Sequence, residues 1–214
     1  MLTNCCPAST TLPTIPAEHC ARNFGQIQKI IFQHIWQRDG VKNYVVESHY
    51  GVLAFWASLK VSTGNDKIAV TPFIESPSDD GGDARTYGGG NDTLNGIEIV
   101  IGSNPVNFTC RLNGKEQSII AELKKLMCDA HNGDTLGVYL INENGQIEGI
   151  IGETPSGEQD PFAIYPIPIQ RLFVGDKHHG NFDGPDYNEL SFSFTPVYIR
   201  FLETITLDAS ALVL

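Results

Sequence analysis

Most of the chain after residue 25 has the pattern of short β-strands separated by turns. Over residues 26–35, apolar side chains occupy both alternating sets of positions, which is typical of a strand buried on both faces or lying at an interface. Glu143-Asn144-Gly145 predicts a hairpin turn between two later strands. Pro166 and Pro168 predict that the segment around them is an edge strand or a bulged one. The further strands that we expect cover residues 52–61, 67–74, 97–101, 106–112, 135–142, 146–153, 163–174 and 189–207.

One segment, residues 115–131, has the period of an amphipathic helix instead. Its apolar side chains recur at helical spacing and form one stripe, which comprises Ile119, Ile120, Leu123, Leu126, Met127 and Ala130. Asn132-Gly133 supplies the residues that commonly end a helix. We expect Cys128 to face the core from this helix.

Residues 75–96 show neither period and predict the longest irregular loop of the chain. The stretch ESPSDDGGDARTYGGGNDTLNG has five glycines before Asn91, which make its backbone permissive and costly to order. A loop of this length inside a compact domain is usually functional or disordered. Residues 176–188 predict a second polar loop.

These elements predict a mainly β fold: an antiparallel β-sandwich or barrel with one amphipathic helix at about 115–131 and long loops. Strands and helices do not alternate, so no parallel sheet is expected. We expect one β domain over residues 26–214, with its long loop at 75–96. Residues 1–25, where Pro7, Pro13 and Pro16 stand among Ser and Thr, predict an extended amino-terminal arm.

Composition excludes several classes of protein. The chain has 214 residues, of which 41% are hydrophobic and 9% aromatic, so it can bury a substantial core. Its net charge of −11 argues against a protein that coats DNA or RNA, because affinity for phosphates comes chiefly from Lys and Arg. No apolar run approaches the roughly 18–20 residues of a membrane span, and the first residues lack the pattern of a secretory signal.

Possible metal sites have simpler interpretations. Zinc ligands are present in Cys5, Cys6, His19 and Cys20, but no CxxC pair occurs among the five cysteines, and reduced thiols explain them. The acidic residues of the long loop have no known calcium spacing, and solvated carboxylates explain them; they are Asp79, Asp80, Asp83 and Asp92.

The densest set of metal-binding or acid–base groups lies in the second loop, and a polar surface turn is its simpler interpretation; the set comprises Asp176, His178, His179, Asp183 and Asp186. The glycine-rich stretch lacks the GKS/T ending of a phosphate loop, and no GxSxG occurs. We therefore predict that the chain is not an enzyme, with no catalytic residue, no metal and no cofactor. Two alternatives stay open: a carbohydrate-binding β-sandwich that stacks sugars on Trp36, Trp56 or Tyr87, and a hydrolase with its acids at 176–186.

The order of these elements resembles the tail tube proteins of long-tailed bacteriophages. The resemblance lies in the plan of the chain: strands, a long loop between early strands, one amphipathic helix and strand-rich ends. The segments Gly25-Gln26-Ile27 to Phe32-Gln33 and Phe55-Trp56 to Thr71-Pro72-Phe73 are also similar to virion proteins from phages of the Bacteroides lineage.

The resemblance implies a structural virion protein that self-assembles. Such subunits form rings, usually hexamers, that stack into a tube through which DNA passes without specific binding, alongside other virion proteins and with no membrane. Assembly takes place in the host cytoplasm. The resemblance makes 75–96 the arm that reaches the next ring, with assembly residues Asp79, Asp80, Asp83, Arg85 and Tyr87. It also makes the first strand an inter-subunit strand through Ile27, Ile31 and Phe32. A neck, other tail or capsid-decorating subunit is the alternative within the same class.

Overall fold

The structure is a computed structural model that describes residues 25–90, 96–130, 135–153, 162–180, 184–194 and 202–206. The expected arm at 1–25 therefore lies outside the described residues except for Gly25. The described residues form thirteen strands, two α-helices and one 3-10 helix, η1 (Glu47–His49). The α-helices are α1 (Leu53–Val61) and α2 (Gln117–Ala130). The strands are β1 (Ile27–His34), β2 (Val45–Val46), β3 (Ile68–Val70), β4 (Glu75–Asp79), β5 (Ala84–Gly88), β6 (Glu98–Ser103), β7 (Val106–Asn113), β8 (Leu136–Asn142), β9 (Gln146–Glu153), β10 (Phe162–Tyr165), β11 (Ile167–Val174), β12 (Tyr187–Phe194) and β13 (Leu202–Thr206).

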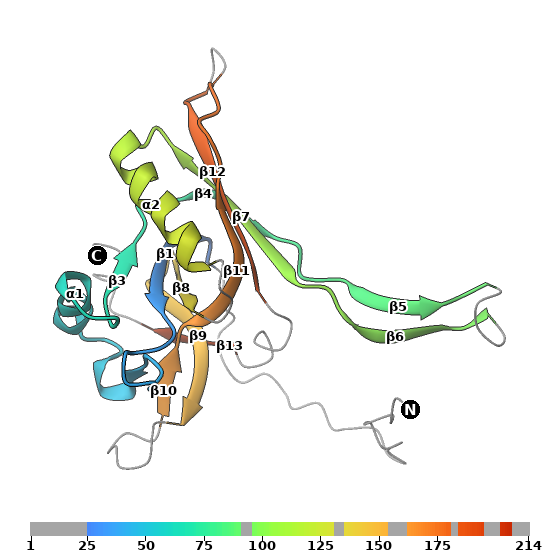
Figure 1. Ribbon diagram of the computed structural model, residues 1–214, viewed down its shortest axis with the longest axis horizontal. Helices are drawn as coiled ribbons and strands as arrows, with labels where there is room; N and C mark the ends of the chain where they lie inside the picture. The colour runs from blue at the N-terminus through green and yellow to red at the C-terminus, as the bar shows by residue number, and fades with distance from the viewer. Residues whose placement is uncertain are drawn as a thin grey trace.

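The fold is mainly β and antiparallel, as predicted (Figure 1). The main sheet runs in the order β2-β10-β9-β8-β11-β12-β7-β4, with β1 paired to β8 and β3, and β13 paired to β9. Every pairing between described strands is antiparallel. Because this path of described strands ends at β4 without returning to β2, a sandwich describes it better than a barrel.

Strand β1 is buried on both faces, which confirms the prediction for this segment. Ile30 and Phe32 belong to the larger hydrophobic core, whereas Ile31 between them belongs to the second core. Successive side chains of a strand point to opposite faces, so this one strand separates and supports two packed layers. Each large apolar side chain that is fully buried contributes about 1.5–3 kcal/mol.

Helix α2 covers the larger core and confirms the predicted amphipathic helix. Ile120, Leu123 and Ala130 are buried, and the other apolar side chains of its stripe pack partly against the same core. Cys128, in contrast, is exposed, so the prediction that it faces the core is wrong. Of the two cysteines in the described residues, Cys110 on β7 is the buried one, and burial first, then the charge of Glu189, raises the pKa of its thiol to about 12.

Residues 53–61 form helix α1, so the strand predicted over 52–61 is wrong. The Trp56 indole packs edge-on against Tyr139 with 5.6 Å between ring centroids, and its Nε1 donates a hydrogen bond to the Tyr50 carbonyl (3.2 Å). Trp56 and Leu59 are the buried members of the helix, and they lie three residues apart. A short apolar run fits a strand and a buried helix equally well by periodicity, and packing on the second core decides here.

The segment around the two prolines is bulged, but it is not an edge. Pro166 separates β10 from β11, and β11 lies between β8 and β12 in the sheet. Its register shifts between Gln170 and Phe173, where Arg171 has a φ of 56°. Pro168 pairs with Gly137 of β8. Glycine is needed there because a Cβ on residue 137 would lie only 2.8 Å from the Cβ of Pro166. The hairpin predicted between β8 and β9 is confirmed.

Residues 75–96 do not form one irregular loop, which corrects the sequence-based prediction. They contain β4, which joins the edge of the main sheet at β7, and β5, which pairs with β6 in a separate two-stranded sheet. All five glycines have a positive φ, from 56° to 98°, which glycine adopts at little cost; four of them lie beside the strands and Gly88 ends β5. Since these strands are polar or exposed, they lack the alternation that reveals a half-buried strand.

Candidate functional site

The most unusual feature of the molecule is a β-ribbon that projects from the body (Figure 1). We call the pair β5 and β6, with Ile97, the β5–β6 ribbon; it belongs to a sheet of its own. Every residue of β6 is exposed, and so are four of the five residues of β5. A two-stranded hairpin without a packed face is only marginally stable in water. The ribbon therefore lacks within the described residues the cover that a sheet of this kind usually needs.

The ribbon has one face that is strongly apolar. Tyr87 pairs with Ile99 across the two strands, so their side chains lie on one face. Ile97 lies two residues from Ile99, which places it along the same side of the strand. Ile101 follows at the register shift between Arg85 and Thr86, where alternation no longer fixes the face, and it continues the exposed apolar run of the strand. We call these four residues the apolar strip; they are exposed by 60% (Tyr87), 61% (Ile97), 54% (Ile99) and 50% (Ile101). Scattered apolar side chains are normal on a surface, but a contiguous strip marks an interaction site.

The opposite face of the ribbon is mixed in character. Thr86 pairs with Val100, and Gly88 pairs with Glu98. Val100 is exposed by 65%, so it is an exposed aliphatic side chain comparable to Ile99 but on the other face of the same strand. In the described part of the chain, five of the twelve exposed large apolar side chains lie on this ribbon. That concentration singles the ribbon out from the rest of the surface.

The three aspartates predicted as assembly residues lie at the junction between the ribbon and the main sheet. Asp80 accepts hydrogen bonds from the Asn107 amide N–H (2.8 Å), the Asn107 Nδ2 (2.6 Å) and the Gly82 N–H (3.2 Å). The two bonds from Asn107 are the main cause that lowers the pKa of Asp80. Asp79 accepts a bond from the Gly81 N–H, and the Asp83 carbonyl accepts one from Asn104. These contacts fasten the turn before β5 to the start of β7.

Arg85 and Tyr87, the other predicted assembly residues, lie on β5 and are exposed. Alternation places the two side chains on the same face of the strand, so Arg85 is beside the apolar strip. The sequence argument missed Ile97, Ile99 and Ile101, because it assigned the loop and the following strand to separate elements. Their alternation with Glu98 and Val100, directly after a glycine-rich turn, was the signal available in the sequence.

The inter-subunit role expected for the first strand does not fit its position. Ile31 and Phe32 are exposed by 0% and 1%, and each packs in a core of its own chain. Both edges of β1 are occupied at these positions, by β3 and by β8. Ile27 is half-buried and packs against the larger core. A neighbouring subunit therefore finds no free strand edge at residues 31–33, and we assign Ile31 and Phe32 to the cores.

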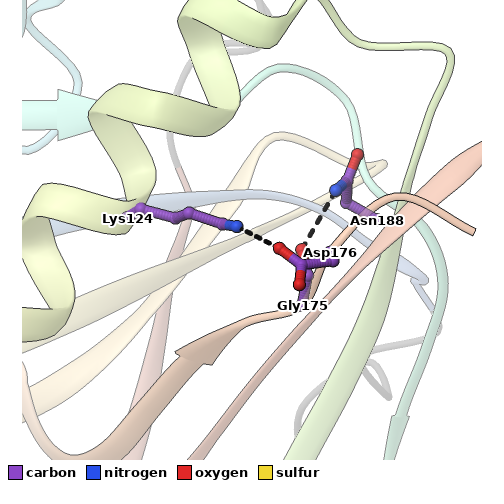
Figure 2. A network of polar contacts seen from close by, with 4 residues as sticks. All are labelled: Lys124, Gly175, Asp176 and Asn188. Carbon is purple, nitrogen blue, oxygen red and sulfur yellow. Dashed lines mark hydrogen bonds and ion pairs between the residues drawn. The ribbon is translucent and has the colours of Figure 1, made fainter.

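In the loop at 176–188, which holds the predicted set of metal-binding or acid–base groups, the charged side chains bind different partners. Asp176 forms an ion pair with Lys124 of α2 (2.6 Å) beside the Asn188 Nδ2, which donates to the Gly175 carbonyl at 3.0 Å (Figure 2). The Lys124 hydrogen bond and charge lower the pKa of Asp176. This contact joins helix α2 to the segment between β11 and β12. It gives Asp176 a structural role at the surface.

The two histidines of this loop also have different surroundings. His178 exchanges two backbone hydrogen bonds with Tyr187 and stacks on its ring at 4.9 Å between centroids. His179 lies 3.8 Å from Asp186, which also pairs with Lys177 and accepts the Gly180 N–H. Around them lies an open polar groove of about 570 Å³, where the Arg111 guanidinium sits 4.7 Å from the Tyr187 ring centre. Asp183, the remaining member of the set, lies outside the described residues.

Within the described residues, no group of three or more His, Cys, Asp or Glu side chains converges as a metal site would require. The cysteines and histidine considered for zinc, and Asp92, lie outside that part of the chain. Groups with a raised or lowered pKa are dispersed. Burial lowers the pKa of Lys29 on β1 and raises the pKa of Glu148 on β9, with smaller effects of Lys60 and Asp79 respectively.

The aromatic residues proposed to stack sugars do not form a platform together. Trp56 is exposed by 1% and is a core residue. Trp36 is exposed by 43%, and the Lys42 ammonium lies 5.3 Å from the centre of its ring. Tyr87 belongs to the apolar strip of the ribbon. No two of the three residues are thus available on one surface as a pair.

Comparison with known proteins adds little to this geometry. No family model matches the chain. Over 74 residues the chain is 31% identical to a nitric oxide synthase of Anopheles stephensi. The matched stretch covers 34% of this chain and 6% of that protein, so the chain corresponds to a small fraction of that enzyme's length. In the part of the chain that the structure describes, no helix is long and apolar enough to cross a membrane.

Proposed function

We propose that this chain is a non-enzymatic structural subunit of a virion, a tail tube protein that assembles into stacked rings around a DNA conduit. The observation that carries the proposal is the β5–β6 ribbon, whose apolar strip has no cover within the described residues. Burying such a strip against another molecule removes apolar surface from water, which is the main favourable term in association. A ribbon with this exposure is better explained as an assembly element than as part of a catalytic centre.

Charge is compatible with the conduit role. The chain carries a net charge of −11, and a wall built from many acidic copies repels the phosphates of a passing duplex. Proteins that hold DNA show the opposite balance, because Lys and Arg supply their phosphate contacts. In this proposal the DNA slides along the tube without being bound. Hexameric rings are the order that the tail tube resemblance implies.

The test is negative-stain electron microscopy of the purified protein over a concentration series, together with sedimentation velocity. We expect rings or tubes with a central hole, and a sedimentation profile that depends on concentration. The matched variant replaces Ile97, Ile99 and Ile101 with serine, which leaves the cores untouched and is expected to remain folded and monomeric. Monodisperse monomers of the unmodified protein at every concentration would contradict the proposal.

A further inference from the structure

The face of the main sheet that points away from helix α2 is polar where β7 and β12 pair. Three cross-strand pairs of side chains with polar groups lie on this outer face: Thr109 with Ser191, Arg111 with Glu189, and Asn113 with Tyr187. The residues between them, such as Cys110 and Leu190, belong to the larger core that α2 covers. Because successive side chains of a strand point to opposite faces, the polar set points away from that core.

This outer face is hollowed at two places that meet at Arg111. The first hollow, of about 570 Å³, is the open polar groove around His178, His179 and Tyr187. The second, of about 240 Å³, is lined by Glu189 on β12, and Arg111 lines both. We call the two hollows together the Arg111 groove. Binding sites for small molecules usually have volumes of this order.

Contacts within the chain hold one wall of the Arg111 groove in place. His178 and Tyr187 exchange backbone hydrogen bonds of 2.7 and 3.0 Å, and their rings stack. Asp186 accepts the Gly180 N–H (2.8 Å) and pairs with Lys177. A site that is fixed before a ligand arrives loses less conformational entropy on binding. The groove is therefore preorganised on the side of the two histidines.

Two charged groups at the centre of the groove keep their hydrogen-bonding capacity. Arg111 and Glu189 are opposite each other, but neither side chain has an ion-pair or hydrogen-bond partner among the described residues. The guanidinium lies over the Tyr187 ring, which leaves the N–H groups at its edge as donors. The carboxylate offers only acceptors, and a neutral imidazole, such as that of His178 or His179, offers one donor and one acceptor. Donors and acceptors thus stand side by side in the groove.

The charges around the groove favour an uncharged ligand. Arg111 has a carboxylate opposite it on each neighbouring strand, Glu75 on β4 and Glu189 on β12. Asp186 adds a third carboxylate, which Lys177 balances. A phosphate, which only accepts hydrogen bonds, would meet more carboxylates than side-chain cations here. A ligand rich in hydroxyl groups uses both kinds of partner, because each hydroxyl both donates and accepts.

An exposed aromatic ring lies beside this polar surface. Phe173 of β11 pairs with Ser191, whereas the next pair, Val174 with Leu190, lies in the larger core, so the Phe173 ring is on the outer face. The Phe173 side chain is exposed by 54%. Ser191 and Tyr187 are four residues apart, so the surface from one to the other is about 13 Å long at about 3.3 Å per residue. An aromatic ring can pack against the C–H face of a sugar while polar side chains bind its hydroxyl groups.

We propose that the Arg111 groove binds a short neutral oligosaccharide. Arg111 and Glu189 hydrogen-bond its hydroxyl groups, and Phe173 packs against the C–H face of one sugar ring. The groove is separate from the β5–β6 ribbon. The inference therefore goes beyond the self-assembly proposed above and does not depend on it.

The test is binding of the full-length protein to an array of neutral oligosaccharides of glucose, mannose, galactose and N-acetylglucosamine. Acidic glycans that contain sialic or glucuronic acid, and inorganic phosphate in a calorimetric titration, are the comparison. We expect binding to at least one neutral series, with an affinity in calorimetry that stays the same from about 0.05 M to about 0.5 M salt, because the ligand carries no charge to screen. Binding confined to acidic glycans or phosphate would overturn the proposal, and so would the absence of binding to every neutral series.

Two matched pairs of variants locate the site. Arg111→Ala is expected to lower the affinity for the bound oligosaccharide about ten-fold, because hydrogen bonds to a charged group are lost, whereas Arg38→Ala in an exposed turn leaves it unchanged. Phe173→Ala is expected to lower it about three- to ten-fold, whereas Phe162→Ala, whose ring is exposed by a similar 51%, has no effect. All four side chains are exposed, so the variants are expected to fold. Equal effects within either pair would place the ligand elsewhere.

Glu189→Gln separates a neutral ligand from an anionic one. The amide keeps an acceptor and removes the charge, so the affinity for a neutral oligosaccharide is expected to stay within about three-fold of the unmodified protein. A rise of about ten-fold or more would mean that the carboxylate repels the ligand, which contradicts an uncharged one. Loss of binding in Arg111→Ala, together with normal rings or tubes in electron microscopy, would show that the groove and the ribbon act independently.

Discussion

The long hairpin that begins at β4 and ends at β7 has two halves with opposite surroundings. In its root, β7 alternates buried and exposed residues, and Phe108, Cys110 and Leu112 lie in the larger core. In its tip, the residues of β6 are exposed on both faces, although β6 is separated from β7 by only Asn104 and Pro105. One hairpin therefore carries both a core strand and a surface that packs on neither core of the described residues.

The edges of the two halves differ as well. The outer edge of the main sheet, β4, contains Pro77, a register shift and Ser76 at a φ of 50°, all of which hinder pairing with another strand. The pairing of β6 with β5 also has a register shift, between Arg85 and Thr86, but β6 has no proline and no lysine, and its centre is Ile99-Val100-Ile101. The difference shows which part of the hairpin is protected from other chains and which part is open to them.

The largest expected effect is the difference in the free energy of unfolding between a variant in the root of the hairpin and a variant in its tip. Phe108→Ala removes a ring that is exposed by 2% and stacked on Phe192, and we expect a loss of about 3–5 kcal/mol in the free energy of unfolding. Tyr87→Ala removes an aromatic side chain of the tip that is 60% exposed, and its effect is expected to stay within about 0.5 kcal/mol. Urea denaturation followed by circular dichroism measures both.

An equal loss of stability in the two variants would break the comparison, because it would mean that the tip packs on its own chain. The assembly assay gives the complementary result. Tyr87→Ala is expected to lower self-association although the monomer remains as stable as the unmodified protein.

A smaller effect is expected at the junction of the two halves. Gly81 and Gly82 both have positive φ, 62° and 69°, so alanine at either position costs about 1–2 kcal/mol of backbone strain. Only at Gly82 does an added Cβ meet other atoms, the Val106 Cγ2 at 2.9 Å and the Asn104 carbonyl at 3.2 Å. Gly82→Ala is therefore expected to be the more destabilising variant in thermal denaturation. Equal melting temperatures would show that the junction is not tightly packed.

The smallest effect is the response of the junction to acid. Hydrogen bonds from Asn107 lower the pKa of Asp80 below its usual 3.8, because they favour the ionised carboxylate. This contribution to stability is complete above pH 3.8 and is lost as the pH falls through the lowered pKa of the folded state. An NMR titration should show the Asn107 amide signal moving in that range.

The control for the titration is Asp80→Asn, which removes the ionisable group and keeps a similar shape. Its Asn107 amide signal should not move over the same pH range. A signal that moves identically in the variant would assign the transition to another group.

Periodicity predicted the parts of the fold where a side chain meets a core. The stripe from Ile119 to Ala130 located α2, and the doubly apolar pattern at 26–35 located β1 between two cores. The turn residues Glu143-Asn144-Gly145 likewise predicted the hairpin of β8 and β9, in which the Asn142 Oδ1 also accepts the Asn144 and Gln146 N–H groups.

The elements that were missed have no such pattern. Helix α1 is a short apolar run whose buried residues, Trp56 and Leu59, are too few to show a period. In β4 and β5, exposure on both faces removes the selection for alternating side chains. The predicted assembly loop at 75–96 stays a prediction; of the exposed apolar strip it includes Tyr87, and the other residues of the strip lie on the next strand.

Strand β1 has a consequence for how the body unfolds. Ile30 and Phe32 hold one layer together and Ile31 holds the other, so neither layer can melt without removing the support of its neighbour. The two layers should therefore lose their structure in a single cooperative transition, with the amides of β1 among the last to exchange with deuterium. The ribbon shares no side chains with either layer, so its paired amides should exchange by local opening and much faster than those of β1.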